Sequence, residues 1–257
     1  MNNPKVSVIT ICYNAINDIE KTILSVINQS YGNKEYIIID GGSSDGTVDV
    51  IKKYESRISK WVSEPDKGIY DAINKGIRKA SGDWINCMNA GDTFYNNRVL
   101  ENIFSTPIPN GISVLYSDHI YKKQDGTEVL CNNELNTHVW SFNHQSIIYK
   151  KELHHRYGYY INSPKLIISD TLFFAPIPDE EKMKVNYVIA IFAAGGSSGM
   201  AGMNITGQNL CAEYIFKNLS FNKIFLLYYW KIIKKMIPES ILNVFRVLKR
   251  HLFNLFK

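Results

Sequence analysis

The chain has 257 residues, of which 45% are hydrophobic, 12% aromatic and 21% charged. This composition excludes a disordered chain or a fibrous repeat and is typical of a globular protein with a large apolar core. The formal net charge is +5, but residues 217–257 hold nine Lys and Arg against one acidic residue, which leaves 20 basic against 23 acidic residues in 1–216. Such a basic tail points to contact with an anionic surface, either nucleic acid or phospholipid.

Cysteine spacing and the N-terminus indicate where the protein resides. The four cysteines lie 75, 44 and 80 residues apart, which is typical of neither a zinc site nor a dense disulfide framework. We therefore expect a reducing, cytoplasmic location. No secretory signal is visible at the N-terminus, and no apolar run approaches the roughly 18 residues that span a bilayer. The sequence thus predicts a protein that is not integral to a membrane.

Short apolar strands alternate with amphipathic helices from the start of the chain. Strands are expected at 5–13, 36–40, 58–63 and 84–88, and helices after Asn17, over 48–54 and over 69–79. This alternation predicts βαβ units and a mostly parallel sheet covered by helices on both faces. In such sheets ligands bind at the carboxyl ends of the strands.

The second half of the chain is patterned less clearly. We expect strands at 113–118, 121–130 and 145–149, and short helices mixed with loops over 150–216. Residues 217–257 are expected to form helices divided at Pro238, because a proline interrupts the helical hydrogen bonds.

Acidic residues follow several of the predicted strands. Asp40 ends the second strand, Asp66 follows the third, and Asp92 lies just beyond the fourth, so their carboxylates should converge on one edge of the sheet. A single carboxylate can bind a divalent cation whose remaining ligands are phosphate oxygens. The alternative is local: Asp40 is also a turn residue, and Asp92 also suits the cap of a helix that begins near Asn97.

Four segments in order carry a resemblance to a known family: VSVITICYN, IIIDGGSSDGT, SEPDKGIYDAINKGIRKASGDWI and NAGDTF. They resemble family 2 glycosyltransferases, specifically the bacterial polysaccharide-assembly members with a GT-A fold. The resemblance covers residues 4–105 and, less closely, 140–200. It implies a Rossmann-like nucleotide-diphospho-sugar transferase domain over 1–216, with a donor half (1–110), an acceptor half (111–216) and a basic amphipathic tail (217–257).

The resemblance also implies a donor site for a nucleotide sugar, with a UDP-sugar expected. By analogy the donor-binding residues are Thr10, Tyr13 and Asn14 beside the nucleotide, Asp40 on the base, Asp66, Lys67 and Gly68 closing over it, Asn74 near the donor, and Asn89 and Gly91 in the metal motif. Gly76 would allow tight packing. Asp92 falls on the last acid of that motif and would bind Mg²⁺ or Mn²⁺ on the diphosphate. Asn89 and Gly91 stand where acids are often found.

In the acceptor half, the resemblance implies that Asp170 is the general base that removes the acceptor proton. The adjacent pair His144 and Gln145 would bind donor or acceptor. A single in-line displacement would invert the anomeric carbon. Because the QxxRW motif of processive members is absent, we expect transfer of one sugar to a saccharide or lipid-linked saccharide.

The basic tail has two interpretations. Its helices could lie on an anionic bilayer, at the inner face of the cytoplasmic membrane, or pack on the catalytic domain with Lys and Arg in water. Nucleic acid is disfavoured because the basic residues stand among large aliphatic side chains. The sequence offers two other functions. One is a catalytically inactive nucleotide-sugar-binding or membrane-associated interaction protein. The other, a sugar nucleotidyltransferase, is disfavoured because no Gly-rich loop with a basic residue follows the first strand.

Overall fold

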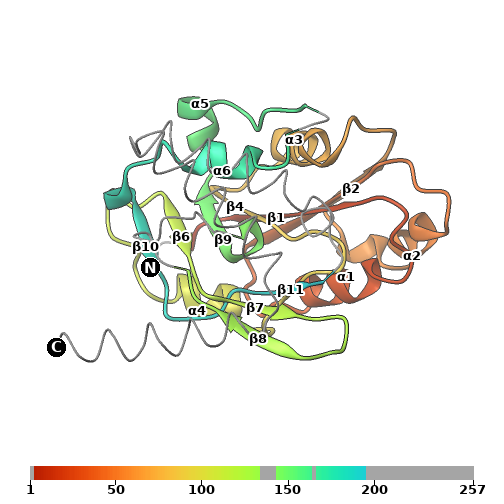
Figure 1. The fold of residues 1–257 in the computed structure, drawn as a ribbon, viewed down its shortest axis with the longest axis horizontal. Coiled ribbons are helices and arrows are strands. Elements are labelled where there is room, and N and C mark those ends of the chain that lie inside the picture. Colours follow the sequence, from red (N-terminus) through yellow and green to blue (C-terminus); the bar gives the residue numbers. More distant parts are fainter. Residues whose placement is uncertain (1–2, 134–142, 164–165, 195–257) are drawn as a thin grey trace, which may run out of the picture. The chain divides into compact units, whose positions relative to one another are not determined.

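A computed structural model describes residues 3–133, 143–163 and 166–194, all within one compact unit. A seven-stranded sheet with the order β10-β6-β9-β4-β1-β2-β3 forms the centre of this unit (Figure 1). Its strands are β1 (Val6–Cys12), β2 (Lys34–Asp40), β3 (Lys60–Ser63), β4 (Trp84–Cys87), β6 (Val114–Tyr116), β9 (Ile147–Lys150) and β10 (Lys182–Lys184). Most neighbours in it are parallel, and β9 is antiparallel to β4 and β6.

A second sheet of four strands, in the order β5-β11-β7-β8, and six α-helices complete the described fold. The strands are β5 (Thr93–Phe94), β7 (His119–Lys122), β8 (Glu128–Cys131) and β11 (Ala190–Ala193). The helices are α1 (Ile19–Ile27), α2 (Thr47–Lys53), α3 (Ile69–Lys79), α4 (Val99–Phe104), α5 (Leu153–Tyr157) and α6 (Ser169–Phe174).

Both faces of the large sheet are buried. Successive side chains of a strand point to opposite faces, so Val8 packs in one apolar cluster with α1 and α4, while Ile9 packs in the other with α3 and α6. Coverage on both sides explains why β1 and β2 are largely apolar on both of their faces. Gly76 of α3 allows the helix to lie against Ile9, as predicted, since a Cβ at position 76 would collide with the Ile9 side chain.

The predicted mostly parallel sheet flanked by helices is confirmed, and α3 has the predicted bounds. Helix α1 begins later than expected: Asp18 precedes it, and no side chain caps it. The short strands β10 and β11 were missed within the region predicted as helices and loops. Each has only three or four residues, and the sequence KMK of β10 alternates polar side chains as befits a sheet edge. The predicted tail over 217–257 lies outside the described residues.

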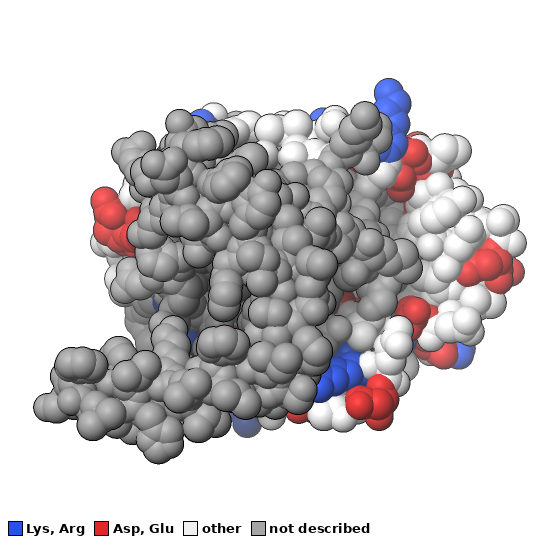
Figure 2. Space-filling view, viewed as in Figure 1, with Lys and Arg blue, Asp and Glu red and all other residues white. Residues whose placement is uncertain are grey.

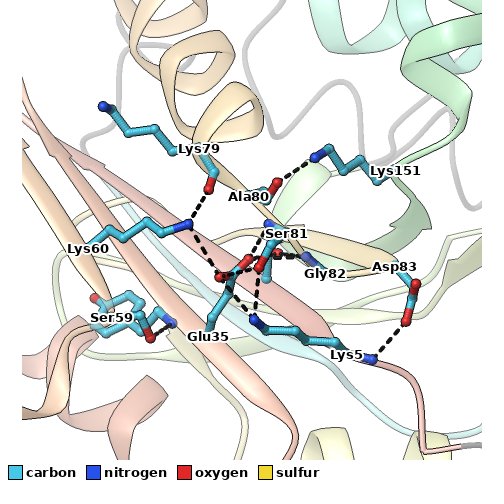
Figure 3. A network of polar contacts seen from close by, with 12 residues as sticks. Lys5, Glu35, Ser59, Lys60, Lys79, Ala80, Ser81, Gly82, Asp83 and Lys151 are labelled. Carbon is cyan, nitrogen blue, oxygen red and sulfur yellow. Dashed lines mark hydrogen bonds and ion pairs between the residues drawn. The ribbon is translucent and has the colours of Figure 1, made fainter.

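A buried carboxylate holds the edge of the sheet that lies opposite the expected ligand edge (Figure 3). Glu35, at the start of β2, accepts hydrogen bonds from the Ser7 hydroxyl (2.6 Å), from the Ser81 backbone N–H and hydroxyl (2.5 and 2.8 Å) and from the Gly82 N–H (3.1 Å). The Lys5 ammonium lies 3.4 Å away. Glu35 therefore ties β1 and β2 to the turn that connects α3 with β4.

This network should make the fold sensitive to acid. Burial alone would raise the pKa of Glu35, but the hydrogen bonds from Ser7 and Ser81 and the charge of Lys5 outweigh it and lower the pKa to about 2. Because the folded-state pKa is lowered, the stabilisation is present above the unfolded value of 4.5 and is lost as the pH falls toward 2.

We expect Glu35→Gln to lower the free energy of unfolding at pH 7 by about 3 kcal/mol, since the amide leaves N–H donors facing one another. Urea unfolding from pH 7 down to pH 3 measures this loss and should show a flatter acid limb for the variant. The control is Glu128→Gln on β8, whose half-exposed carboxylate pairs with Lys122 at 3.7 Å and should change stability by less than about 0.5 kcal/mol. Equal stability of Glu35→Gln and wild type would contradict this account.

Candidate active site

The turn after β4 is clamped at the carboxyl edge of the sheet. Gly91 has a positive φ of 102°, which reverses the chain, and the Asp92 N–H donates to the Asn89 carbonyl at 3.0 Å. Thr22 of α1 is fully buried; its hydroxyl accepts the Gly91 N–H at 2.9 Å and donates to the Asp92 carbonyl at 2.7 Å. The turn is thus fixed from both ends by one side chain.

Asp92 itself is 4% exposed. One carboxylate oxygen accepts from the Gln145 amide at 2.6 Å and the other from the Ala193 N–H at 2.9 Å. Burial raises the pKa of Asp92 to about 6, although the hydrogen bonds from Ala193 and Gln145 oppose the rise. A carboxylate that is buried this deeply is stabilised by a neighbouring cation.

The residues around Asp92 suit an oxygen-coordinated divalent ion. Asn89 Oδ1 and Gln145 Oε1 are buried oxygens without a hydrogen-bond partner among the described residues. Oxygen atoms are the ligands that Mg²⁺ and Mn²⁺ prefer. Within residues 3–133, 143–163 and 166–194, no group of three or more His, Cys, Asp or Glu could hold a metal. Protein oxygens and ligand phosphates would therefore have to share the coordination.

A carboxylate–imidazole pair stands beside this turn. Asp170, in the first turn of α6, has one oxygen 3.0 Å from His144 Nδ1, and His144 Nε2 lies 3.0 Å from the Asn89 amide nitrogen. Because that amide nitrogen donates, Nε2 accepts, which assigns the proton to Nδ1 and makes it the donor to Asp170. The other Asp170 oxygen accepts the Thr171 N–H at 2.8 Å and lies 3.1 Å from the Tyr70 hydroxyl.

The side chains of His144 and Asp170 are 16% and 17% exposed, so both reach solvent while their orientation is fixed. The structure thus brings together the predicted base and the predicted metal residue. Asn89 belongs to the turn of Asp92 and contacts His144, while Gln145 follows His144 and contacts Asp92. The predicted base Asp170 and the predicted metal residue Asp92 are thus linked through the adjacent residues His144 and Gln145.

Asp40 organises the loop that follows β2. It is fully buried and accepts from the N–H groups of Gly42 and Ser43 (3.1 and 2.9 Å) and from the hydroxyls of Ser43 and Ser63 (2.5 and 2.6 Å). The Cys12 thiol lies 3.4 Å away. Burial would raise the pKa of Asp40, but the hydrogen bonds from Ser43 and Ser63 outweigh it and lower the pKa. The carboxylate is therefore ionised. Its contact with the base of a bound nucleotide stays a prediction.

The loop after β1 is locked to the loop after β2. Asn14 adopts a positive φ of 47°; its N–H donates to the Ser43 hydroxyl at 2.7 Å, and its side-chain oxygen accepts the Ser44 N–H at 3.0 Å. Tyr13 is 65% exposed beside them. An exposed ring on a rigid loop is a suitable surface for a planar ligand group, as predicted for the nucleotide.

Asp66 reaches back over the end of β2. A Cβ at Gly41 would lie 2.5 Å from Asp66 Oδ2, so only glycine permits this approach. The other Asp66 oxygen accepts the Gly68 N–H at 2.8 Å, and Gly68 has a φ of 107°. Lys67 is exposed between them. The three predicted residues therefore form a compact turn next to the Asp40 loop.

Two predicted donor residues have their side chains in the interior. Thr10 is fully buried, and its hydroxyl accepts from the Tyr36 hydroxyl at 3.0 Å. The Asn74 amide donates to the Tyr160 carbonyl at 2.8 Å and accepts the Tyr160 N–H at 3.1 Å. Both side chains serve packing here, because each polar group is already paired inside the protein. Their contact with a donor stays a prediction.

Thr22 and Tyr70 contact the site but were not identified from the sequence. Thr22 is a polar residue on the buried face of α1, between Ile19 and Ile23, and such a residue needs an internal partner. That is a usable signal for Thr22. Tyr70 follows the apolar pattern of α3 and carries no comparable signal.

On the described part of the face in Figure 2, acidic and basic side chains lie next to one another near α1 and α2. Ion pairs of α1 and α2 join Lys53 with Glu20 at 2.7 Å and Lys21 with Asp18 at 2.5 Å. Exposed pairs of this kind add little stability.

Among the described helices, none combines the length and apolar character that crossing a membrane requires.

Comparison with known proteins places this chain in a family. The family model for glycosyl transferase family 2 matches residues 7–158. The chain is 34% identical over 127 residues to the putative teichuronic acid biosynthesis glycosyltransferase TuaG of Bacillus subtilis, covering 48% of this chain and 50% of that protein. It is 33% identical over 136 residues to WfgD of Escherichia coli, described as UDP-Glc:alpha-D-GlcNAc-diphosphoundecaprenol beta-1,3-glucosyltransferase, covering 52% and 50%. The matches thus span about half the length of these relatives.

Solved structures share the fold at low identity. The first 349 residues of S. aureus TarS, in complex with UDP-GlcNAc, align with a TM-score of 0.66 and 17% identity over 86% of this chain and 69% of that one. The mannosyltransferase PcManGT of Pyrobaculum calidifontis, in complex with GDP-Man and Mn²⁺, aligns with a TM-score of 0.65 and 17% identity over 84% and 64%. The predicted GT-A fold is confirmed. Because the family model covers more than half of the sequence, the chain belongs to glycosyl transferase family 2.

Proposed function

We propose that this chain is an inverting, metal-dependent glycosyltransferase that moves one sugar from a UDP-sugar to a saccharide or lipid-linked saccharide acceptor. The setting would be the biosynthesis of capsule, exopolysaccharide or O-antigen. The observation that carries the proposal is the link between the two halves of the site: Asn89, on the turn of Asp92, contacts His144, which contacts Asp170. This link supports a proposed base, Asp170, close to a proposed cation site at Asp92.

The donor would lie along the loops after the parallel strands. Tyr13 offers an exposed ring, the turn of Asp66 and Gly68 lies over the end of β2, and Lys67 is free to reach an anionic group. Asp92 would hold the ion, with Asn89 Oδ1 as a second oxygen. When bound, the ion would neutralise the charge that develops on the leaving diphosphate.

Asp170 would remove the proton of the acceptor hydroxyl as its oxygen attacks the anomeric carbon. The His144 N–H and the Thr171 N–H fix the plane of the carboxylate, so that an oxygen stays directed at the acceptor. Attack from the side opposite the leaving diphosphate forms the new bond as the old one breaks, and the configuration inverts.

The relatives and structural neighbours support the substrate class. The WfgD description specifies UDP-Glc and a diphosphoundecaprenol-linked sugar, TarS was solved with UDP-GlcNAc, and PcManGT was solved with Mn²⁺. Residues 217–257 lie outside the described structure. Their contact with an anionic membrane, on its cytoplasmic side, is proposed from their sequence alone and would bring the enzyme to a lipid-linked acceptor.

The test is the melting temperature of the purified chain with UDP, GDP, dTDP and CMP, each with and without Mn²⁺. Ligands that bind the native state raise the apparent stability. A rise with UDP that is larger in Mn²⁺ is expected. No rise with any nucleotide at saturating concentration would overturn the donor site. The chain could bind UDP-sugars but release no UDP from them in the presence of diphospholipid-linked GlcNAc. That result would favour the alternative of an inactive binding protein, which is motivated by Asn89 and Gly91 at positions where acids are often found.

A further inference from the structure

Tyr70 connects the donor loop, which is the turn of Asp66, Lys67 and Gly68, with the segment that carries Asp170. It is the second residue of α3 and follows the turn of Asp66 and Gly68. Its side chain is buried, and its hydroxyl lies 2.6 Å from the Ile167 carbonyl oxygen and 3.1 Å from Asp170 Oδ1. One hydroxyl thus contacts both the carboxylate and the backbone three residues before it.

The hydroxyl can serve both protonation states of Asp170. It has one proton to donate and two lone pairs to accept with. While Asp170 is ionised, Tyr70 donates to it. After Asp170 has taken a proton, the new O–H can donate to the Tyr70 oxygen, while Tyr70 donates to the Ile167 carbonyl. The Tyr70 hydroxyl therefore has a hydrogen-bond acceptor in either protonation state, because it can donate to the Ile167 carbonyl once Asp170 no longer accepts from it.

Tyr70 retains its own proton in this exchange. Burial, and then the negative charge of Asp170, raise the pKa of Tyr70. The phenol is therefore a fixed donor and acceptor and does not act as the base. Its ring packs at 5.8 Å from that of Tyr160, which holds the hydroxyl in position.

We propose that Tyr70 is a positioning residue that holds the Asp170 carboxylate in one orientation before and after proton transfer and joins it to the helix behind the donor loop. The proposal rests on the proposed role of Asp170 as the base. The other titratable groups that face Asp170 are His144, which donates to it, and Cys87 of β4 and Tyr160, which sense its charge.

The experiment compares Tyr70→Phe with Tyr160→Phe in the full chain. Each variant keeps a buried ring and loses one hydroxyl, but the Tyr160 hydroxyl donates to Tyr149 at 3.3 Å and does not contact Asp170. Two measurements are made: hydrogen exchange of the peptide covering residues 166–172, and kcat against pH for UDP-glucose and diphospholipid-linked GlcNAc.

For Tyr70→Phe we expect faster exchange in residues 166–172, a fall in kcat of about ten-fold with little change in the donor KM, and an acid limb of the kcat profile displaced to higher pH. The displacement follows because the hydrogen bond that Tyr70 donates to the ionised carboxylate is stronger than the one it accepts from the neutral acid, so the variant favours the protonated form of Asp170. Tyr160→Phe should keep the wild-type exchange in this peptide and the wild-type limb.

The inference is overturned if Tyr70→Phe matches Tyr160→Phe in exchange, or if exchange rises but kcat and its pH profile stay at wild-type values. Failure of the proposed function gives a different result. Either wild type releases no UDP from UDP-glucose in the presence of diphospholipid-linked GlcNAc, or Asp170→Asn turns over as fast as wild type. In that case faster exchange in Tyr70→Phe would limit Tyr70 to anchoring α6 and would overturn its role in transfer.

Discussion

Asp170→Asn is expected to lower kcat by about three orders of magnitude while the donor KM changes by less than about two-fold. An amide has no basicity with which to take the acceptor proton, whereas it keeps the size of the carboxylate. Its oxygen can still accept the Thr171 N–H at the start of α6. Its NH₂ can face His144 if the imidazole proton moves to Nε2 and the Asn89 amide turns, because Asn89 Oδ1 is free to accept. The variant should therefore fold.

The measurement is the initial rate of UDP release with saturating donor and acceptor. Asp49→Asn on α2 is the matched control, since that carboxylate is 83% exposed and pairs with Lys52 at 3.9 Å. It should turn over at the wild-type rate. An Asp170→Asn rate within about ten-fold of wild type would remove Asp170 from the role of base.

The second large effect is expected at Asp92. Asp92→Asn should abolish the Mn²⁺-dependent part of the rise in melting temperature with UDP and lower kcat by about two orders of magnitude or more. The neutral amide is a much weaker ligand for a hard cation than a carboxylate. The metal-free fold should survive, because the amide oxygen can accept the Ala193 N–H and Gln145 can turn its unpaired oxygen toward the new NH₂.

Differential scanning fluorimetry with and without Mn²⁺ separates the metal-dependent stabilisation by UDP from the stability of the metal-free fold. Since burial raises the pKa of Asp92 to about 6, its charge opposes folding at neutral pH, and its removal should not lower the melting temperature without metal. A variant that melts like wild type but keeps the full Mn²⁺ effect would contradict the assignment of Asp92.

The first ninety residues could be predicted well because local signals agree there. Helix α3 lies between a positive-φ glycine and a polar turn, and its buried face repeats at helical spacing, which fixes both its type and its bounds. The largely apolar sequences of β1 and β2 predict a parallel sheet, because the strands of such a sheet are covered on both faces, as they are here.

Contacts between distant segments could not be predicted. Asp92 and Gln145 were each selected, but their direct hydrogen bond joins residues 53 positions apart, and the donor from Ala193 lies 101 positions away in a strand that the pattern did not reveal. Motif position likewise could not show that the side chains of Thr10 and Asn74 are paired inside the protein. Periodicity reports which face of an element is buried and not which partner it meets.

The most direct test of the central claim, an inverting transfer from a nucleotide sugar with Asp170 as the base, is the anomeric configuration of the product. The purified full chain is incubated with UDP-α-D-glucose, Mn²⁺ and diphospholipid-linked GlcNAc, and the new linkage is assigned by proton NMR. A β-linked glucose, formed by wild type and not by Asp170→Asn, is the predicted result. An α-linked product, or a β-linked product formed equally well by Asp170→Asn, would contradict the account.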